Sequence, residues 1–224
     1  MSTNERILSP FTLPNGTELK NRLLMAPMTT CTGYYDGTVT SELVEYYRAR
    51  AGSIGTIIVE CCFVDDLGLA FPGAIGIDND EKIAGLAKIA DAIKSKGSKA
   101  LLQIYHGGRM VDPKLIGGRT PVGPSAVAAP RDGAATPVAL TAEEVEGMIG
   151  KFGEAVRRAI QAGFDGVEIH GANTYLIQQF FSPNSNQRDD EWGGSRENRA
   201  KFPLAVLDIT HKMVRQYADD AFII

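Results

Sequence analysis

The sequence predicts a parallel α/β fold, and three observations support this. Short apolar runs rich in β-branched residues alternate along the chain with longer segments that repeat their hydrophobic residues at helical spacing. Three of the helical segments stop at a glycine. Such alternation is typical of a parallel sheet, either doubly wound or closed into a barrel. The chain has no G-x-G-x-x-G after its first strand and no G-x-x-x-x-G-K-[ST], which favours the barrel.

The first elements are a hairpin, a strand and a helix. Phe11 to Lys20 is expected to form the hairpin, because Asn15-Gly16 between extended segments is typical of a type I′ turn. The apolar segment Leu23 to Met28 is predicted to be a buried strand. Ser41 is expected to cap the helix, which ends at Gly52.

The middle of the chain repeats this pattern. Gly55 to Val64 is continuous and apolar apart from Glu60, so we expect a central strand covered on both faces. Asp80 to Lys96 has a helical period, and Ala100 to Tyr105 is a short apolar strand.

Two further units complete the pattern. Thr141 and Glu144 form a predicted capping box that opens a long helix, and Gly166 to His170 is the strand that follows it. A fourth helix is predicted from about Arg196 to Tyr217, and Ala221 to Ile224 begins a fifth strand.

The four strand–helix units occupy nearly all 224 residues, so an eight-unit barrel would need ~400 residues. We therefore expect one partial barrel domain over residues 1–224, truncated at its C-terminal end and inactive alone. An open half-barrel leaves two strand edges unpaired. We expect it to form a homo-oligomer or to pair with a missing C-terminal half.

The composition narrows the functional classes. Lys and Arg number 23 against 27 Asp and Glu, for a formal net charge of −4, so nucleic-acid phosphates meet no strongly basic surface. No apolar run approaches the ~20 residues that span a bilayer, and the N-terminus lacks the apolar core of a signal peptide. The three cysteines indicate no disulfide framework. We expect a cytoplasmic protein that binds neither nucleic acid nor membrane.

Chemistry-bearing side chains follow the predicted strands, where parallel α/β folds place their reactive groups. The fourth strand carries most of them, with His170, Asn173 and Tyr175 close together. A His or Asn donor can polarise a carbonyl oxygen, and a Tyr hydroxyl can protonate a developing carbanion. A strand-end histidine is equally often a satisfied polar group, so a purely structural role stays open.

A long ordered string of segments makes the sequence recognisable from Leu19 onward. They are Lys20-Asn21-Arg22, Ala26-Pro27-Met28-Thr29, Ile57-Ile58-Val59-Glu60, Gln103, His106-Gly107-Gly108-Arg109, Val167-Glu168-Ile169-His170, Leu176, Gln179-Phe180, Ser182-Pro183, Ser185-Asn186, Arg188, Asp190-Glu191-Trp192-Gly193-Gly194-Ser195 and Glu197-Asn198-Arg199. With these segments at this spacing, the chain resembles the Old Yellow Enzyme family of flavin-dependent NAD(P)H oxidoreductases, the ene-reductases.

The resemblance implies a (β/α)₈ TIM barrel, of which this chain covers about the first four βα units and the start of the fifth strand. It also implies FMN bound non-covalently at the carboxyl face. By position, Thr29 would hydrogen-bond the flavin carbonyl that tunes reduction, and Gln103 would bond the pyrimidine edge. Pro27, Met28 and Cys61 would offer backbone or packing contacts.

The implied reaction has two halves. NADH or NADPH gives a hydride to FMN, and the reduced flavin passes a hydride to the β-carbon of an α,β-unsaturated carbonyl compound. His170, counted among the flavin contacts as well, and Asn173 would hold the oxygen of the substrate. Tyr175 would protonate the α-carbon. The expected partner is therefore a small activated alkene.

The sequence departs from the family pattern in two ways. Thr174 stands where a glycine is common, and a β-branched residue resists a positive φ, so we expect the local turn to differ. The family's flavin-binding arginine and phosphate-binding loops lie beyond Ile224.

Two other functions remain open. A metal-dependent barrel hydrolase could use His106 and His170 at neighbouring strand ends, although the chain has no H-x-H or H-E-x-x-H spacing and we expect no metal site. A non-catalytic half-barrel could act as an interaction unit through its exposed strand edges.

Overall fold

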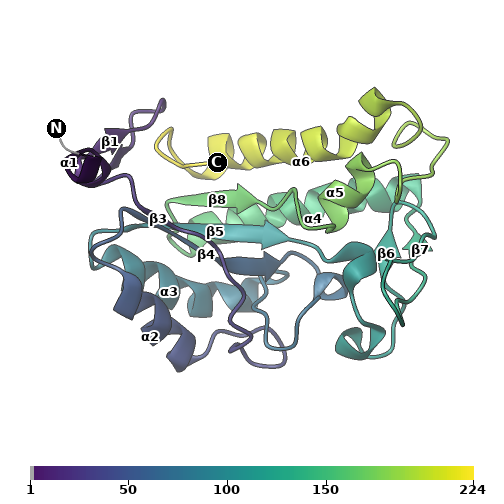
Figure 1. The fold of residues 1–224 in the computed structure, drawn as a ribbon, viewed down its shortest axis with the longest axis horizontal. Helices are drawn as coiled ribbons and strands as arrows, with labels where there is room; N and C mark the ends of the chain where they lie inside the picture. Colours follow the sequence, from purple (N-terminus) through teal and green to yellow (C-terminus); the bar gives the residue numbers. More distant parts are fainter. Residues whose placement is uncertain (1–2) are drawn as a thin grey trace.

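A computed structural model describes residues 3–224, and its centre is a four-stranded parallel sheet. The strands lie side by side in the order β3 (Leu24–Met25), β4 (Thr56–Phe63), β5 (Lys99–Tyr105) and β8 (Gly166–Ile169). Leu24 pairs with Thr56 at one edge, and Leu101 pairs with Gly166 at the other. Because every pairing is parallel, the carboxyl ends of the strands lie together at one end of the sheet (Figure 1).

A long helix follows each strand, which confirms the predicted alternation. The helices are α2 (Ser41–Arg50), α3 (Ile83–Lys94), α4 (Ala142–Gln161) and α6 (Arg196–Tyr217). The predicted capping box of α4 is confirmed, since Thr141 Oγ1 accepts from Glu144 N–H and Glu144 Oε2 accepts from Thr141 N–H. The prediction of Ser41 as the cap of α2 is wrong. Thr40 has the extended backbone of a cap and accepts the Leu43 N–H at 3.2 Å.

Shorter elements fill the connections. They are α1 (Thr3–Leu8), α5 (Leu176–Phe181), the strands β6 (Val122–Gly123) and β7 (Val138–Ala139), and the 3₁₀ turns η1 (Asp66–Gly68), η2 (Asp80–Lys82), η3 (Gly108–Met110) and η4 (Pro113–Ile116). The turn η2 leads directly into α3, so the helix predicted from Asp80 begins as a 3₁₀ turn. Helix α5 lies at the carboxyl end of the sheet (Figure 1).

The predicted N-terminal hairpin is present, but its predicted turn type is wrong. The paired strands are β1 (Phe11–Thr12) and β2 (Glu18–Leu19). A type I′ turn needs a positive φ at both Asn15 and Gly16, and only Gly16 has one, at +86°. The Gly16 N–H donates to Leu13 O at 2.9 Å across Pro14. Proline restricts the second turn position to φ near −65°, which is incompatible with type I′.

The first strand of the sheet differs from the predicted buried strand over Leu23 to Met28. Only Leu24 and Met25 pair with β4. Leu24 is 57% exposed and Met28 is 69% exposed. The reason is position, because β3 is an edge strand with a partner on one side only among residues 3–224.

The opposite edge meets the end of the chain. The Val167 N–H of β8 donates to Ile223 O, and the Ile223 N–H donates to Asp165 O, both at 2.9 Å. Ile223 also forms a parallel bridge with Gly166. These contacts confirm that a fifth strand begins within the predicted segment Ala221 to Ile224.

The central strand β4 is buried along its entire length, as predicted. Its register against β5 shifts between Val59 and Cys62. Glu60 contacts α2, where the Tyr47 O–H donates to its carboxylate at 3.1 Å, while Cys61 contacts Thr29. An irregularity of this kind re-aims side chains, and here it directs Cys61 to the side of the sheet that carries the strand-end residues.

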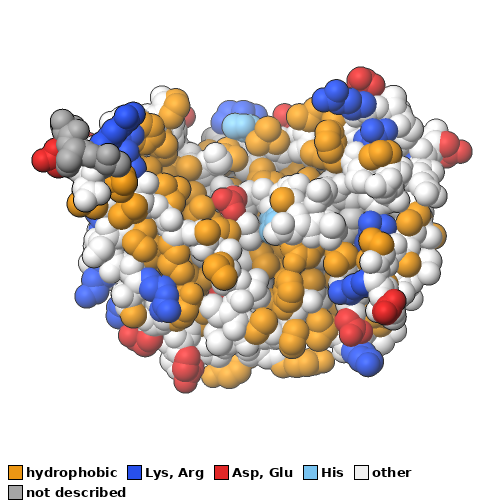
Figure 2. Space-filling model, in the orientation of Figure 1, with side chains coloured by type: hydrophobic (Ala, Val, Ile, Leu, Met, Phe, Trp, Pro, Cys, Tyr) orange, Lys and Arg blue, Asp and Glu red, His pale blue; other side chains and the backbone are white. Residues whose placement is uncertain are grey.

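The main core lies between the sheet and its helices. It contains Leu43, Ile57, Val59, Leu86, Ile93, Leu102, Ile104, Phe152, Val167 and Phe202. A second, smaller cluster contains Cys61, Phe63, Tyr105, Val111 and Ile116. No helix passes in front of the sheet in Figure 1. Figure 2, in the same orientation, shows hydrophobic side chains over the middle of this face and charged side chains mostly around its rim.

Candidate functional site

Each strand of the sheet places at least one predicted site residue near its carboxyl end. Thr29 follows β3, Cys61 lies in β4, Gln103 lies in β5 and His170 follows β8. Thr29 Oγ1 is 3.0 Å from Cys61 Sγ. Burial raises the pKa of the Cys61 thiol to about 11, so it is neutral at pH 7. Adjacent parallel strands thus place four predicted residues in one row.

Gln103 is held by the neighbouring strand. Its Nε2 donates to Glu168 Oε1 at 2.6 Å, and the two residues are direct partners in the register of β5 and β8. Gln103 is only 8% exposed, so a buried carboxamide and a carboxylate satisfy each other. This contact fixes the amide and leaves its carbonyl oxygen as an acceptor.

His170 and Tyr175 come together as predicted. Their rings lie perpendicular with centroids 4.9 Å apart, and Tyr105 packs against Tyr175 with centroids 5.2 Å apart. Burial lowers the pKa of His170, which favours the neutral imidazole at pH 7. The Ala172 N–H donates to His170 Nδ1 at 3.3 Å, so the proton of the neutral ring is on Nε2. Burial raises the pKa of Tyr175 to about 12, which keeps its hydroxyl protonated.

The backbone of the turn between these two residues differs from the prediction at Thr174. Thr174 adopts a φ of +62° directly after Asn173 at +55°, so the expectation that its β-branched side chain would keep this turn out of the left-handed region is wrong. Two hydrogen bonds hold Thr174 in place. Its N–H donates to Gln178 Oε1 at 2.5 Å, and its carbonyl accepts from Gln179 Nε2 at 2.6 Å. Asn173 itself is exposed on this turn.

Gln179 is a residue whose role the sequence reasoning missed. It is 1% exposed, and its carboxamide joins two loops at the carboxyl end of the sheet. Besides Thr174 O, its Nε2 donates to Gly107 O at 3.1 Å, and its Oε1 accepts from the Arg109 N–H at 3.1 Å. A Cβ at Gly108 would lie 2.2 Å from Gln179 Oε1, so the amide has room at this position only because residue 108 has no side chain. The sequence did offer a signal for this role, because Gln179 lies within the apolar run Leu176–Phe181 and a buried amide requires hydrogen-bond partners.

His106 lies away from the row formed by Thr29, Cys61, Gln103 and His170. Its Nδ1 accepts from the Gly108 N–H at 3.0 Å, and its Nε2 lies 3.7 Å from Asp65 Oδ2. Lys151 of α4 donates to the same carboxylate at 2.7 Å. Within residues 3–224, no group of three or more His, Cys, Asp or Glu side chains is placed to hold a metal ion. The hydrolase interpretation therefore has no support in this part of the chain.

Pro27 and Met28 complete the set of predicted flavin contacts. Pro27 is half-buried, and Met28 is exposed on the segment between β3 and Thr29. Both lie at the carboxyl end of the edge strand, next to the row of strand-end side chains. The exposed side chain of Met28 therefore leaves apolar surface beside that row.

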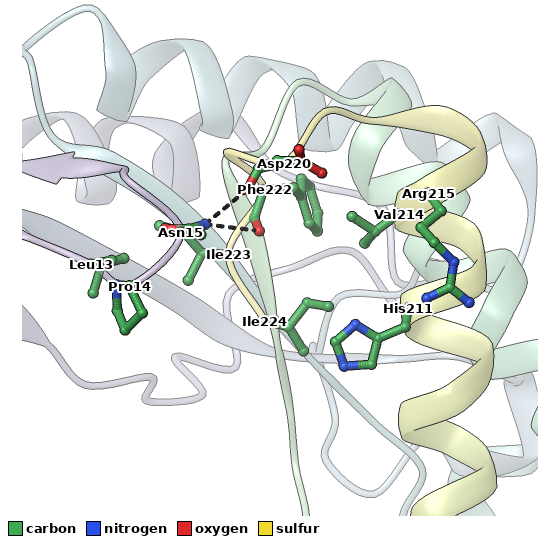
Figure 3. Close-up of a pocket in the computed structure, with 10 residues that line it drawn as sticks. All are labelled: Leu13, Pro14, Asn15, His211, Val214, Arg215, Asp220, Phe222, Ile223 and Ile224. Carbon is green, nitrogen blue, oxygen red and sulfur yellow. Dashed lines mark hydrogen bonds between the residues drawn. The ribbon is translucent and has the colours of Figure 1, made fainter.

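A separate apolar cavity of ≈ 390 Å³ lies near the amino end of the sheet. Figure 3 shows its lining, which comes from the hairpin loop, the end of α6 and the last residues: Leu13, Pro14, Asn15, His211, Val214, Arg215, Asp220, Phe222, Ile223 and Ile224. Asn15 Nδ2 donates to Asp220 O at 3.0 Å across one side of it. None of the predicted site residues lines this cavity.

Comparison with known proteins supports the assignment of a family. The family model described as "NADH:flavin oxidoreductase / NADH oxidase family" matches residues 6–222. The chain belongs to this family. It is 88% identical over 224 residues to "NADH:fumarate oxidoreductase" of Klebsiella pneumoniae (strain 342), covering 100% of the chain and 24% of that protein. It is 58% identical over 219 residues to "NADH:acrylate oxidoreductase" of Vibrio harveyi, covering 98% of the chain and 22% of that protein.

A solved member of the family supports the fold. The old yellow enzyme homologue from Zymomonas mobilis superposes with a TM-score of 0.86 at 33% identity, over 96% of this chain and 61% of that one. The fold is therefore the amino-terminal part of an Old Yellow Enzyme barrel, with four βα units and the start of a fifth strand. The chain spans about a quarter of the length of the two curated relatives. None of the helices in residues 3–224 is both long and apolar enough to cross a membrane.

Proposed function

We propose that the protein containing this chain is an FMN-dependent oxidoreductase that uses NADH or NADPH to reduce the activated C=C bond of an α,β-unsaturated carbonyl compound. The observation that carries the proposal is the row of strand-end side chains from Thr29 to His170, with Tyr175 packed perpendicular to the imidazole. Membership of the NADH:flavin oxidoreductase family supports it.

The side chains of the row have the chemistry that the flavin edge requires. A flavin pyrimidine ring alternates carbonyl acceptors with an N–H donor, and a hydroxyl and a carboxamide can both donate and accept. Thr29 would bond the ring carbonyl, and the Gln103 oxygen left free by Glu168 would accept the ring N–H. Cys61, a neutral thiol, would pack beside Thr29, with Pro27 and Met28 along the ring edge.

When bound, FMN supplies the redox chemistry by accepting a hydride from NAD(P)H and returning a hydride to the β-carbon of the alkene. The His170 Nε2–H would donate to the substrate oxygen, and the amide NH₂ of Asn173 would donate to the same atom. These donors stabilise the negative charge that grows on that oxygen during hydride addition. Tyr175 then releases its proton to the α-carbon, so that one hydride and one proton saturate the bond.

The names of two relatives agree with this acceptor class. Fumarate and acrylate each carry a C=C bond conjugated to a carboxyl carbon, and both are named in the titles of the similar proteins. An electron-withdrawing oxygen next to the alkene is the feature that His170 and Asn173 would recognise. We therefore infer that the substrate is a small alkene of this kind.

Substitution of Tyr175 tests the proposal in the full-length protein. Tyr175→Phe should slow alkene reduction at least about 100-fold, because only this half-reaction needs the proton. The rate of flavin reduction by NAD(P)H, followed in a stopped-flow spectrophotometer, should change by less than about twofold. Tyr34→Phe, at a side chain 57% exposed, is the matched control. An equal loss in both half-reactions would refute the role of Tyr175.

We further propose that residues 1–224 form one partial barrel domain that requires the remainder of the protein for activity. The chain covers 61% of the solved homologue, and β3 has an unpaired outer edge among the described residues. Its partner would be the C-terminal half of the barrel or a second copy.

A further inference from the structure

Arg109 has an unusual setting for a charged side chain. It lies in η3 and is only 8% exposed. Its Nη1 donates to Val127 O at 3.3 Å and to Ala128 O at 3.1 Å, whereas its Nε is buried without a partner. The guanidinium edge formed by Nε and Nη2 can bind a carboxylate side-on through two parallel hydrogen bonds. On this edge, Nε is buried and makes no hydrogen bond, and the two hydrogen bonds of the guanidinium are both made by Nη1.

The positive charge of Arg109 lacks an acidic partner. None of the ion pairs formed among residues 3–224 includes it. Burial lowers the pKa of the guanidinium, as expected for a cation removed from water with no anion beside it. A buried, uncompensated charge is costly, so a bound anion at this position would stabilise the fold.

A cavity of ≈ 60 Å³ lined by residues with polar side chains adjoins Arg109. Its lining consists of Arg109, Thr174, Gln178, Gln179, Ser182 and Ser185. No acidic side chain is among them, and Arg109 supplies the only charge. One water needs ~10–15 Å³ of cavity volume, and about four such volumes fit in ≈ 60 Å³. The cavity therefore has room for a ligand of about four heavy atoms. Gln178 Oε1 accepts the Thr174 N–H, which leaves the Gln178 amide NH₂ as a second donor.

We propose that this cavity binds a small free carboxylate the size of formate or acetate, held side-on by the Nε–Nη2 edge of Arg109 and by the Gln178 amide. The site is separate from the row of strand-end side chains, because the residues that line the cavity and the row have no member in common, so it does not depend on the proposed reaction. It lies directly behind the Asn173–Thr174 turn, because Thr174 and Gln178 belong to both.

A crystal structure of the full-length protein grown in 100 mM formate provides the first test. We expect a planar three-atom ion with both oxygens within hydrogen-bond distance of Arg109 Nε and Nη2. Water alone on this edge would overturn the proposal. So would an Asp or Glu side chain from the remainder of the protein, because the charge would then be compensated internally.

Thermal unfolding of the full-length protein in solution provides the second test. At constant ionic strength, replacing chloride with 100 mM acetate should raise the unfolding midpoint by about 2 °C or more. Arg109→Lys, which lacks the two-donor edge, should remove this increase, and Arg119→Lys on the surface should retain it.

Gln178→Glu keeps the test decisive if Arg109→Lys does not fold. The new carboxylate would still accept the Thr174 N–H and would pair with Arg109 inside the cavity. This variant should therefore be insensitive to acetate. An acetate response equal to that of the wild type in Gln178→Glu would overturn the proposal.

Discussion

Thr174 adopts a left-handed conformation although its side chain is β-branched and exposed. This conformation costs a non-glycine residue roughly 1–2 kcal/mol, which the hydrogen bonds to Gln178 and Gln179 offset. Thr174→Gly removes the strain but adds about 0.5–1 kcal/mol of chain entropy to the unfolded state. We therefore expect Thr174→Gly to be neutral or to stabilise the protein by up to about 1 kcal/mol in urea unfolding.

The control is Thr136→Gly, because Thr136 is also an exposed loop threonine but has no positive φ. It has no strain to relieve, so it should lose about 0.5–1 kcal/mol. Equal losses in the two variants would show that Thr174 is not strained.

Single residues were predictable where one strand end determines their position. His170 and Tyr175 meet because both follow β8, and Gln103 lies near them because β5 is the adjacent strand. Gln179 was not predicted as a structural link, because its partners, Gly107 and Arg109, are about 70 residues away in sequence. Only tertiary packing shows that one amide holds two loops.

At the scale of elements, the sequence predicted features that depend on residues close by in the chain. It did not predict features that depend on which strand lies alongside. The capping box at Thr141 and the helical periods depend on nearby residues, so α4 and α6 were predicted with accurate bounds. The register shift in β4 depends on how β5 lies against it, and the short length of β3 depends on its place at the edge of the sheet. Hydrophobic pattern alone does not contain this information.

Asp65 connects three elements and leads to a prediction about pH. It is a buried carboxylate after β4 that contacts His106 after β5 and Lys151 in α4. Burial opposes its ionisation, but the two neighbouring side chains hold its pKa well below the usual range. A carboxyl with a lowered folded-state pKa stabilises the fold above its unfolded pKa, near 3.9, and this contribution is lost as the pH falls further.

Asp65→Asn should therefore destabilise the protein by about 1–3 kcal/mol at pH 7, measured by urea unfolding. The gap between wild type and variant should narrow below about pH 4, as the Asp65 carboxylate is protonated in the wild type. Asp66→Asn, whose carboxylate is 58% exposed and pairs with Arg119 at the surface, should shift stability by less than about 0.5 kcal/mol. A gap that stays constant down to pH 2 would contradict this account.

At the scale of the whole molecule, the alternation of strands and helices predicted a parallel sheet but could not distinguish a doubly wound sheet from a barrel. The distinction depends on whether helices cover both faces of the sheet. Among residues 3–224, no helix passes in front of the face of the sheet shown in Figure 1. The strand-end row lies at the carboxyl end of the same sheet. The family resemblance predicted the barrel correctly because its motifs report tertiary constraints that periodicity does not.

The open edges of this half-barrel determine how residues 1–224 should behave alone. Among the described residues, the outer edge of β3 has no partner strand and offers its backbone groups to another chain, so we expect the isolated chain to sediment as a dimer or larger species. The family resemblance implies phosphate-binding loops outside these residues, so we expect FMN to bind at least about 100-fold more weakly than to the full-length protein, as measured by quenching of flavin fluorescence. Adding the separately produced remainder should restore both flavin affinity and a defined mass, because it would pair the open edges and complete the site. A monomer of residues 1–224 with one tightly bound FMN would contradict both expectations.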